Sequence, residues 1–163
     1  MKKYALPALA AALVIVAAVV IFAVPRGDTT ETDGGYAARN ESGDVVISAS
    51  ELSENQISFY KLAEGSKIEL IAIRGADGAA YAALGTCQSC NGSPNAYYTQ
   101  NGEVLQCNNC GLTFPLSIIG TSGAGCHPIL MDDSAVERNG GDLVIDAELL
   151  SVYEPLFTRV AEH

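Results

Sequence analysis

Hydrophobic residues are distributed unevenly along the chain. Residues 4–24 carry no charge and consist mostly of Ala, Val, Leu and Ile, whereas later apolar residues come in short runs between turn residues. At ~1.5 Å per residue, a helix of this length spans the ~30 Å hydrocarbon core of a membrane. The run therefore predicts an N-terminal transmembrane helix.

The residues around this run predict its orientation in the membrane and whether it is cleaved. Lys2 and Lys3 precede it, and because basic residues stay on the cytoplasmic side, the rest of the chain is expected on the extracytoplasmic side. A cleaved signal peptide is the alternative, but it would have a shorter apolar region, and Val24-Pro25 is a poor cleavage site. We therefore expect an uncleaved signal anchor that crosses the cell membrane once.

The remaining chain is expected to form a linker followed by one domain. Residues 25–44 are rich in Gly, Thr, Asp and Glu, which is typical of a flexible linker. Ordered structure is expected from Val45 onward, so the domain covers residues 45–163.

Short apolar or alternating runs predict that this domain is mainly β. Residues 68–73 become apolar on both faces, which favours a central strand. Asp77-Gly78 and Asn101-Gly102 are strong hairpin signals. The expected strands cover residues 45–49, 57–62, 68–73, 79–84 and 143–146.

Near the C-terminus, the spacing of the apolar residues is that of a helix and not that of a strand. Apolar residues from Leu149 to Val160 recur at helical spacing, which predicts an amphipathic C-terminal helix with a kink or its true start at Pro155. The predicted fold is therefore a small, mainly β domain of the α+β class, with antiparallel sheets and a C-terminal helix.

The part of the chain that follows the apolar run is strongly acidic. The formal net charge is −10, and because both lysines precede the run and all 19 acidic residues follow it, the rest of the chain carries −12. This balance argues against nucleic acid as a partner, since phosphate binding needs a basic face. We find no phosphate-binding loop, nucleophile elbow or catalytic His pair, so a binding or electron-transfer protein is expected rather than an enzyme.

Four of the five cysteines form a pattern that is typical of a metal site. Cys87 and Cys90, and then Cys107 and Cys110, form two C-x2-C pairs separated by 16 residues. Two thiols three residues apart on a tight turn point at one ion, and two such turns complete a tetrahedral four-thiolate site. The spacing predicts a metal bound by these four cysteines in zinc-ribbon-like or rubredoxin-like knuckles.

The Asn101-Gly102 turn is expected to bring the two pairs together. If these two residues form the centre of the turn, Tyr98 pairs with Leu105, and Cys107 lies opposite residue 96. The hairpin then places the second C-x2-C turn beside the first.

Other uses of the four thiols stay open. An extracytoplasmic domain can form two disulfides, and a C-x2-C pair can be a thioredoxin-like redox site, although no convincing helix follows the second motif. Zinc would make the site structural, whereas iron, as a single ion or an iron–sulfur cluster, would make it an electron carrier. The two N-terminal lysines are not a twin Arg signal, which favours a metal acquired after export.

The fifth cysteine lies in a Gly-rich loop. Cys126 and His127 follow the Gly-rich residues 120–125, and Met131 is near them in the sequence. Cys, His and Met together are the soft ligands that copper sites use. Cys126 therefore has three interpretations. It can form a copper site with His127 and Met131, it can be an additional ligand of the four-cysteine site, or it can be a partly buried thiol without a metal.

Residues 68–128 carry several motifs whose order resembles the FtrD-like family of membrane iron–sulfur proteins. These motifs are the apolar strand 68–73, Cys87-Gln-Ser-Cys90, Tyr97 or Tyr98 before the Asn-Gly turn, Val104-Leu-Gln-Cys107-Asn-Asn-Cys110-Gly111, Phe114, Ile118 or Ile119, and Gly125-Cys126-His127-Pro128. The resemblance implies a membrane-tethered module in which the five cysteines hold a redox centre on the outer face of the membrane. Some members of the family are associated with ferrous-iron uptake, so the resemblance also implies a membrane iron-transport or redox partner.

Three functions are compatible with these observations. The first is an extracytoplasmic, membrane-anchored protein whose thiolate-bound iron passes electrons to or from a partner. The second is a structural zinc-ribbon module that displays an interaction surface. The third is delivery of copper or another metal through Cys126, His127 and Met131.

Overall fold

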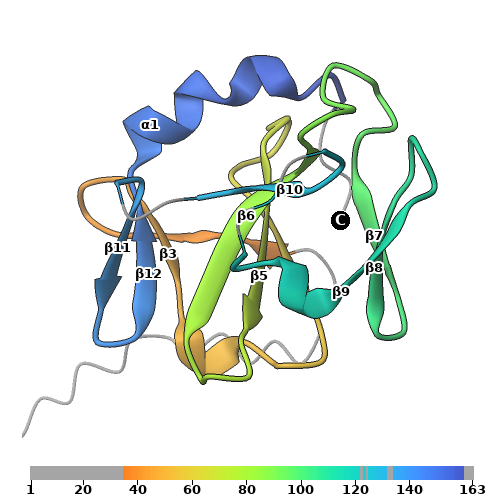
Figure 1. The fold of residues 1–163 in the computed structure, drawn as a ribbon. Coiled ribbons are helices and arrows are strands. Elements are labelled where there is room, and N and C mark those ends of the chain that lie inside the picture. Colours follow the sequence, from red (N-terminus) through yellow and green to blue (C-terminus); the bar gives the residue numbers. More distant parts are fainter. Residues whose placement is uncertain (1–34, 122, 124, 132–133, 160–163) are drawn as a thin grey trace, which may run out of the picture. The chain divides into compact units, whose positions relative to one another are not determined.

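A computed structural model of the chain describes residues 35–121, 123, 125–131 and 134–159 (Figure 1). The chain divides into two units, Met1–Thr30 and Glu31–His163, and the described residues all belong to the second. The predicted transmembrane helix at residues 4–24 lies outside them. Within the described part, every helix is too short or too polar to cross a membrane.

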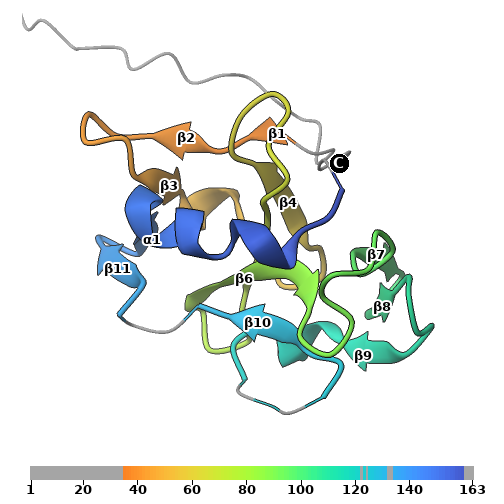
Figure 2. The ribbon, with the colours of Figure 1, turned by 90° about the horizontal axis from the view of Figure 1, so that it is seen from above.

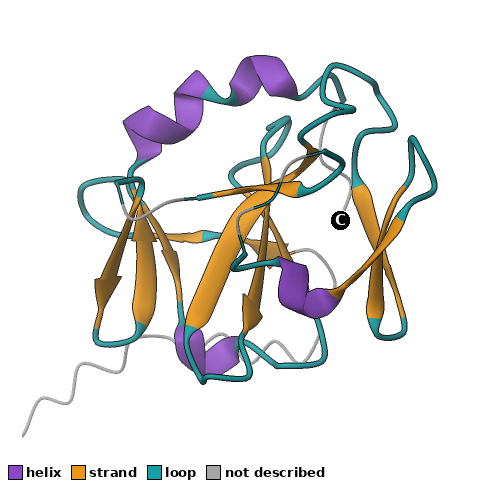
Figure 3. Cartoon of the chain, in the orientation of Figure 1, coloured by secondary structure: helices purple, strands orange, loops and turns teal. Residues whose placement is uncertain are grey.

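Three sheets build the described unit, and its few helical segments are short (Figure 3). A five-stranded sheet has the order β1-β4-β5-β6-β10, a four-stranded sheet the order β11-β12-β3-β2, and a three-stranded sheet the order β7-β8-β9. The strands are β1 (Gly35–Tyr36), β2 (Ala38–Arg39), β3 (Val45–Ile47), β4 (Ser58–Lys61), β5 (Glu69–Arg74), β6 (Ala80–Cys87), β7 (Tyr98–Asn101), β8 (Val104–Cys107), β9 (Thr113–Pro115), β10 (Pro128–Leu130), β11 (Val136–Asn139) and β12 (Asp142–Ile145). The helical segments are α1 (Ala147–Val152), η1 (Ala49–Glu51), η2 (Leu116–Ile118) and η3 (Glu154–Leu156).

These strands confirm that the domain is mainly β with antiparallel sheets. Only β1 and β4 pair in parallel among the named strands. The expected central strand at residues 68–73 is also confirmed, because β5 lies between β4 and β6 in the middle of its sheet.

Strands β5 and β6 divide the buried residues into two cores, because successive side chains of a strand point to opposite faces. Core A, on one face, includes Val45, Leu70, Leu84, Leu143 and Leu150. Core B, on the other face, includes Ile71, Ala83, Cys87, Tyr98 and Cys107. The cysteine-bearing hairpin β7–β8 therefore packs on the opposite face from α1 (Figure 2 shows both elements).

Part of the expected linker is ordered. Residues 35–39 form β1 and β2, which pair with β4 and β3 respectively. The two strands lie at edges of their sheets, where an added strand finds free backbone N–H and C=O groups. Ordered structure therefore begins before Val45.

The C-terminal helix is shorter than the sequence predicts. Asp146 caps α1 by accepting hydrogen bonds from the backbone N–H groups of Glu148 and Leu149 at 2.7 and 3.0 Å. The helix ends at Val152, and Pro155 lies in the following 3-10 turn η3. Proline has no backbone N–H and clashes with the carbonyl four residues earlier. The expected kink or helix start at Pro155 is therefore wrong, because α1 lies before the proline and Pro155 belongs to the separate turn η3.

The register of the cysteine hairpin also differs from the expected one. Asn101 pairs with Val104, and Tyr98 rather than residue 96 lies opposite Cys107. Gly102 is the first residue of the turn, with φ of +62°. A Gly at this position, followed by a residue with negative φ, is typical of a type II′ turn. The pair that closes the hairpin therefore lies one residue later in the sequence, on both strands, than expected.

Gly85 on β6 offers a test of this packing. A Cβ at this position would lie 2.7 Å from Oε1 and 3.1 Å from Cβ of Glu69 on the neighbouring strand. We expect Gly85→Ala to lower the free energy of unfolding by about 1–3 kcal/mol, because the crowded site must shift. Urea denaturation followed by circular dichroism measures this change.

Gly35→Ala is the matched control, since no atom lies within 4 Å of the position where its Cβ would be. Equal stability losses in the two variants would contradict the packing of Glu69 over Gly85.

Candidate metal centre

The first C-x2-C turn follows the end of β6. The Cys87 side chain is fully buried, and its carbonyl accepts hydrogen bonds from the N–H groups of Cys90 (3.1 Å) and Asn91 (2.8 Å). These bonds fold the turn tightly, so that both thiols of the pair lie on the same side. The half-buried Cys90 is closer to solvent than Cys87.

The second turn follows the end of β8 in the same way. Cys107 is fully buried, and its carbonyl accepts a hydrogen bond from the N–H of Gly111 at 2.8 Å. Gly111 has φ of +73°, a conformation that a side chain disfavours. Cys110 is exposed.

Backbone hydrogen bonds join the two turns. The N–H of Cys87 donates to the carbonyl of Ala96 at 3.1 Å, and the N–H of Asn108 donates to the carbonyl of Tyr97 at 2.9 Å. Thr86 and Tyr97 form an isolated antiparallel bridge. The hairpin is therefore attached to the end of β6, and the two C-x2-C turns lie side by side.

The loop with the fifth cysteine reaches the same place. Pro128, at the start of β10, pairs with Cys87, and the N–H of Gln88 donates to the carbonyl of His127 at 2.8 Å. The hydroxyl of Tyr98 donates to the carbonyl of Cys126 at 3.2 Å. These contacts bring the half-buried Cys126 to the four-cysteine site.

The five sulfur atoms form two overlapping groups that share Cys90. Within each group the atoms lie within 4.8 Å of one another; one group is Cys87, Cys90 and Cys107, and the other is Cys90, Cys110 and Cys126. Metal–sulfur bonds of ~2.3 Å in a tetrahedron place sulfur atoms about 3.8 Å apart. Each group therefore offers three sulfur atoms at a spacing that suits one thiolate-bound metal ion such as zinc or iron, and the two groups share Cys90.

Hydrogen bonds and burial act on these thiols in opposite directions. Burial acts to raise the pKa of Cys87, but hydrogen bonds from the Tyr98 hydroxyl and the backbone of Ser89 and Cys90 outweigh it and lower the pKa. Burial raises the pKa of Cys107. Neighbouring thiolates repel one another, and a bound cation removes this repulsion and deprotonates the thiols that coordinate it.

The other two candidate ligands lie differently. Met131 packs in core A, on the face of the sheet away from the cysteines. The His127 ring lies beside the Phe114 ring, with 5.6 Å between centroids, and its buried Nδ1 has no hydrogen-bond partner in the described structure. Neither sulfur group includes His127, so the described structure does not assemble the copper set of Cys126, His127 and Met131.

Two supporting residues could not be assigned from the cysteine spacing. Tyr98 is fully buried, and burial raises the pKa of its hydroxyl, which therefore stays protonated. Its single hydrogen can serve either the Cys126 carbonyl, 3.2 Å away, or the Cys87 thiolate. The Asn109 side chain hydrogen-bonds to Cys90 and accepts a 2.7 Å hydrogen bond from the Ser93 hydroxyl. Such outer hydrogen bonds orient ligands and tune the metal.

Comparisons with known proteins agree with the cysteine pattern. A family model described as "Membrane iron-sulfur containing protein FtrD-like" matches residues 52–157, which include all five cysteines. No curated protein and no solved structure matches the chain.

Tyr98→Phe tests the supporting role of the tyrosine hydroxyl. We expect metal affinity to fall about 10- to 100-fold, because Cys87 and the Cys126 loop lose a donor while the buried ring is kept. Competition for cobalt(II) with a chromophoric chelator measures the affinity.

Tyr97→Phe is the control, because the Tyr97 ring packs under Arg159, and Tyr97 contacts Asn108 through its backbone carbonyl, which the substitution keeps. Equal affinity of Tyr98→Phe and the unaltered protein would show that the hydroxyl does not support the site.

Proposed function

The chain belongs to the FtrD-like family of membrane iron-sulfur containing proteins, and we propose that it is a membrane-anchored electron-transfer protein that holds iron through cysteine thiolates. The observation that carries this proposal is the gathering of five sulfur atoms from three separate segments at one end of β6. Iron held by thiolates supplies one-electron redox chemistry.

The burial of the cysteines supports a redox role over a purely structural one. Cys87 and Cys107 are fully buried, whereas Cys110 is exposed and Cys126 half-buried. A structural zinc site needs four closed ligands and gains nothing from an exposed one or from a fifth thiol. An exposed ligand shortens the distance over which an electron travels to a docked partner.

The two C-x2-C pairs favour a single ion held by Cys87, Cys90, Cys107 and Cys110, with Cys126 as an additional thiol. In a cluster, inorganic sulfide separates the irons and spreads the thiolates that bind them, whereas the sulfur groups here are compact.

The N-terminal sequence supports the placement of this centre. Residues 4–24 are long and apolar enough for a single span, and two lysines precede them. We propose that the domain faces the extracytoplasmic side, where a membrane iron-transport or redox protein is the electron partner.

The fifth thiol favours metal delivery as a second candidate function. A sulfur next to a four-thiolate site can bind the ion while another ligand leaves, so that the ion moves on by ligand exchange. Cys126 would serve this step, since its sulfur lies within 4.8 Å of those of Cys90 and Cys110.

Metal content and an absorption spectrum test the proposed function. We expect the full chain, purified anaerobically in detergent, to contain iron and to show visible thiolate-to-iron bands that bleach with dithionite. A colourless protein with one zinc per chain would overturn the redox role in favour of the structural one, and two disulfides without metal would overturn both.

Single cysteine variants separate the roles of the thiols. We expect Cys107→Ser to lose at least 10-fold in iron per chain, because it removes a buried ligand, and Cys126→Ser to keep most of the iron. If Cys126→Ser keeps its bands but transfers iron to a chelator much more slowly, the delivery function is favoured.

A further inference from the structure

Glu69 is a buried acidic residue in an otherwise apolar stretch of β5. The side chain is 3% exposed, and no other charged residue of the described structure is buried. Neither carboxylate oxygen has a hydrogen-bond partner in the described structure. A buried carboxylate without such a partner is costly, so it is seldom kept without a role.

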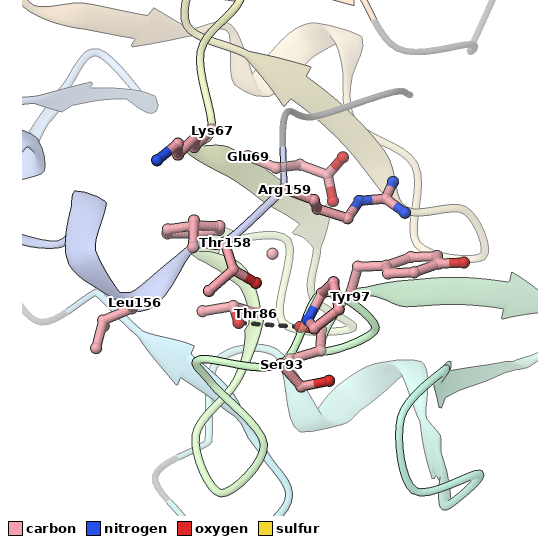
Figure 4. Close-up of a pocket in the computed structure, with 12 residues that line it drawn as sticks. Lys67, Glu69, Thr86, Ser93, Tyr97, Leu156, Thr158 and Arg159 are labelled. Atoms are coloured by element: carbon pink, nitrogen blue, oxygen red, sulfur yellow. Dashed lines mark hydrogen bonds between the residues drawn. The ribbon is translucent and has the colours of Figure 1, made fainter.

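Glu69 lines a small pocket, here called the Glu69 pocket, together with Lys67, Thr86, Tyr97 and Arg159 (Figure 4). The cavity has a volume of about 20 Å³, which is room for one water molecule and not for an organic ligand. The cavity therefore has room for a water molecule beside the carboxyl group and does not hold a substrate.

Two cations, Lys61 and Arg159, act on the Glu69 carboxylate. Lys61 lies directly opposite on β4, Lys67 precedes β5, and Arg159 approaches from the C-terminal segment, where it covers the Tyr97 ring. Burial raises the pKa of Glu69 to about 7, although Arg159 and Lys61 oppose the rise. The carboxyl therefore changes its protonation near neutral pH.

The Glu69 pocket adjoins the metal centre. The register of β5 and β6 places Glu69 opposite Gly85, on the same face as Cys87 two residues further along, about 7 Å away along the strand. On the far wall, Ser93 donates to Asn109, which hydrogen-bonds to Cys90.

The segment that builds the centre has almost no charge of its own. Residues 78–131 contain one acidic residue, the exposed Glu103 in the hairpin turn, and no Lys or Arg. His127 is the other titratable side chain of this segment apart from Tyr and Cys. This segment therefore has almost no charge that could compensate the negative charge of an added electron. The nearby buried carboxyl group can compensate it by binding a proton.

We propose that Glu69 is a proton site coupled to the metal centre. Its carboxylate takes up one solvent proton when a one-electron reductant reduces the thiolate-bound metal, and it releases that proton on reoxidation. No other bond forms or breaks. This inference rests on the proposed electron-transfer function.

The shift that reduction of the metal causes in the pKa of Glu69 is large enough to measure. At an effective dielectric constant of about 20, a negative charge about 10 Å away raises the pKa of a carboxyl by about one unit. Reduction therefore raises the pKa of Glu69 above its value of about 7. The reduction potential should fall with rising pH in the range just above that value and be level at lower and at higher pH.

Potentiometric titrations of the iron-loaded full chain in detergent, with dithionite and hexacyanoferrate(III) from pH 5 to 9, test this proposal. We expect the reduction potential of the unaltered protein to depend on pH, the dependence to be lost in Glu69→Gln, and the dependence to be kept in the control Glu103→Gln.

A second variant, Lys61→Gln, removes the cation opposite Glu69, so we expect the pH-dependent region of the potential to move to higher pH. This variant keeps the test available if Glu69→Gln does not fold.

The outcomes separate the two proposals. A reducible centre whose potential is level from pH 6 to 8, or whose slope persists in Glu69→Gln, overturns the coupling and leaves electron transfer intact. A centre that dithionite cannot reduce overturns the proposed function, and with it the coupling.

Discussion

The attachment of two chain segments to the end of β6 is the constraint on which the rest of the structure depends. The hairpin β7–β8 is hydrogen-bonded to β6 through Ala96 and Tyr97, and β10 pairs with β6 at Cys87. Each bond is an ordinary backbone interaction, but together they bring five sulfur atoms into two overlapping groups. Without this junction the two C-x2-C turns and the Cys126 loop would have no common position.

The same junction gives the site its graded exposure. Core B packs against the hairpin and buries Cys87 and Cys107, whereas the turns that follow the strands carry Cys90 and Cys110 outward. The site therefore has one side that is protected from bulk water and one side that faces the solvent. The segment that carries the five cysteines adds almost no charge of its own, since Glu103 is the one acidic residue of residues 78–131.

Much of the fold follows from local patterns in the sequence, and the errors have specific physical causes. The central strand at residues 68–73 was predictable because its apolar run is long, and the sheets were predictable from alternation and turn signals. The short strands β1, β2 and β9 were not, since two or three residues carry no period. The hairpin register depended on which turn position Gly102 occupies, and that one-residue difference places Tyr98 opposite Cys107.

The sequence by itself determined the thiol pairs, because two cysteines three residues apart need only a local turn to face one ion. It also determined the apolar run at residues 4–24 and the acidic balance of the rest. Tertiary structure alone decided that Cys126 joins the cluster while Met131 packs in core A, and that Glu69 is buried. Burial and long-range proximity depend on what the neighbouring strand presents, and here β6 presents Gly85, whose missing side chain leaves the space that Glu69 fills.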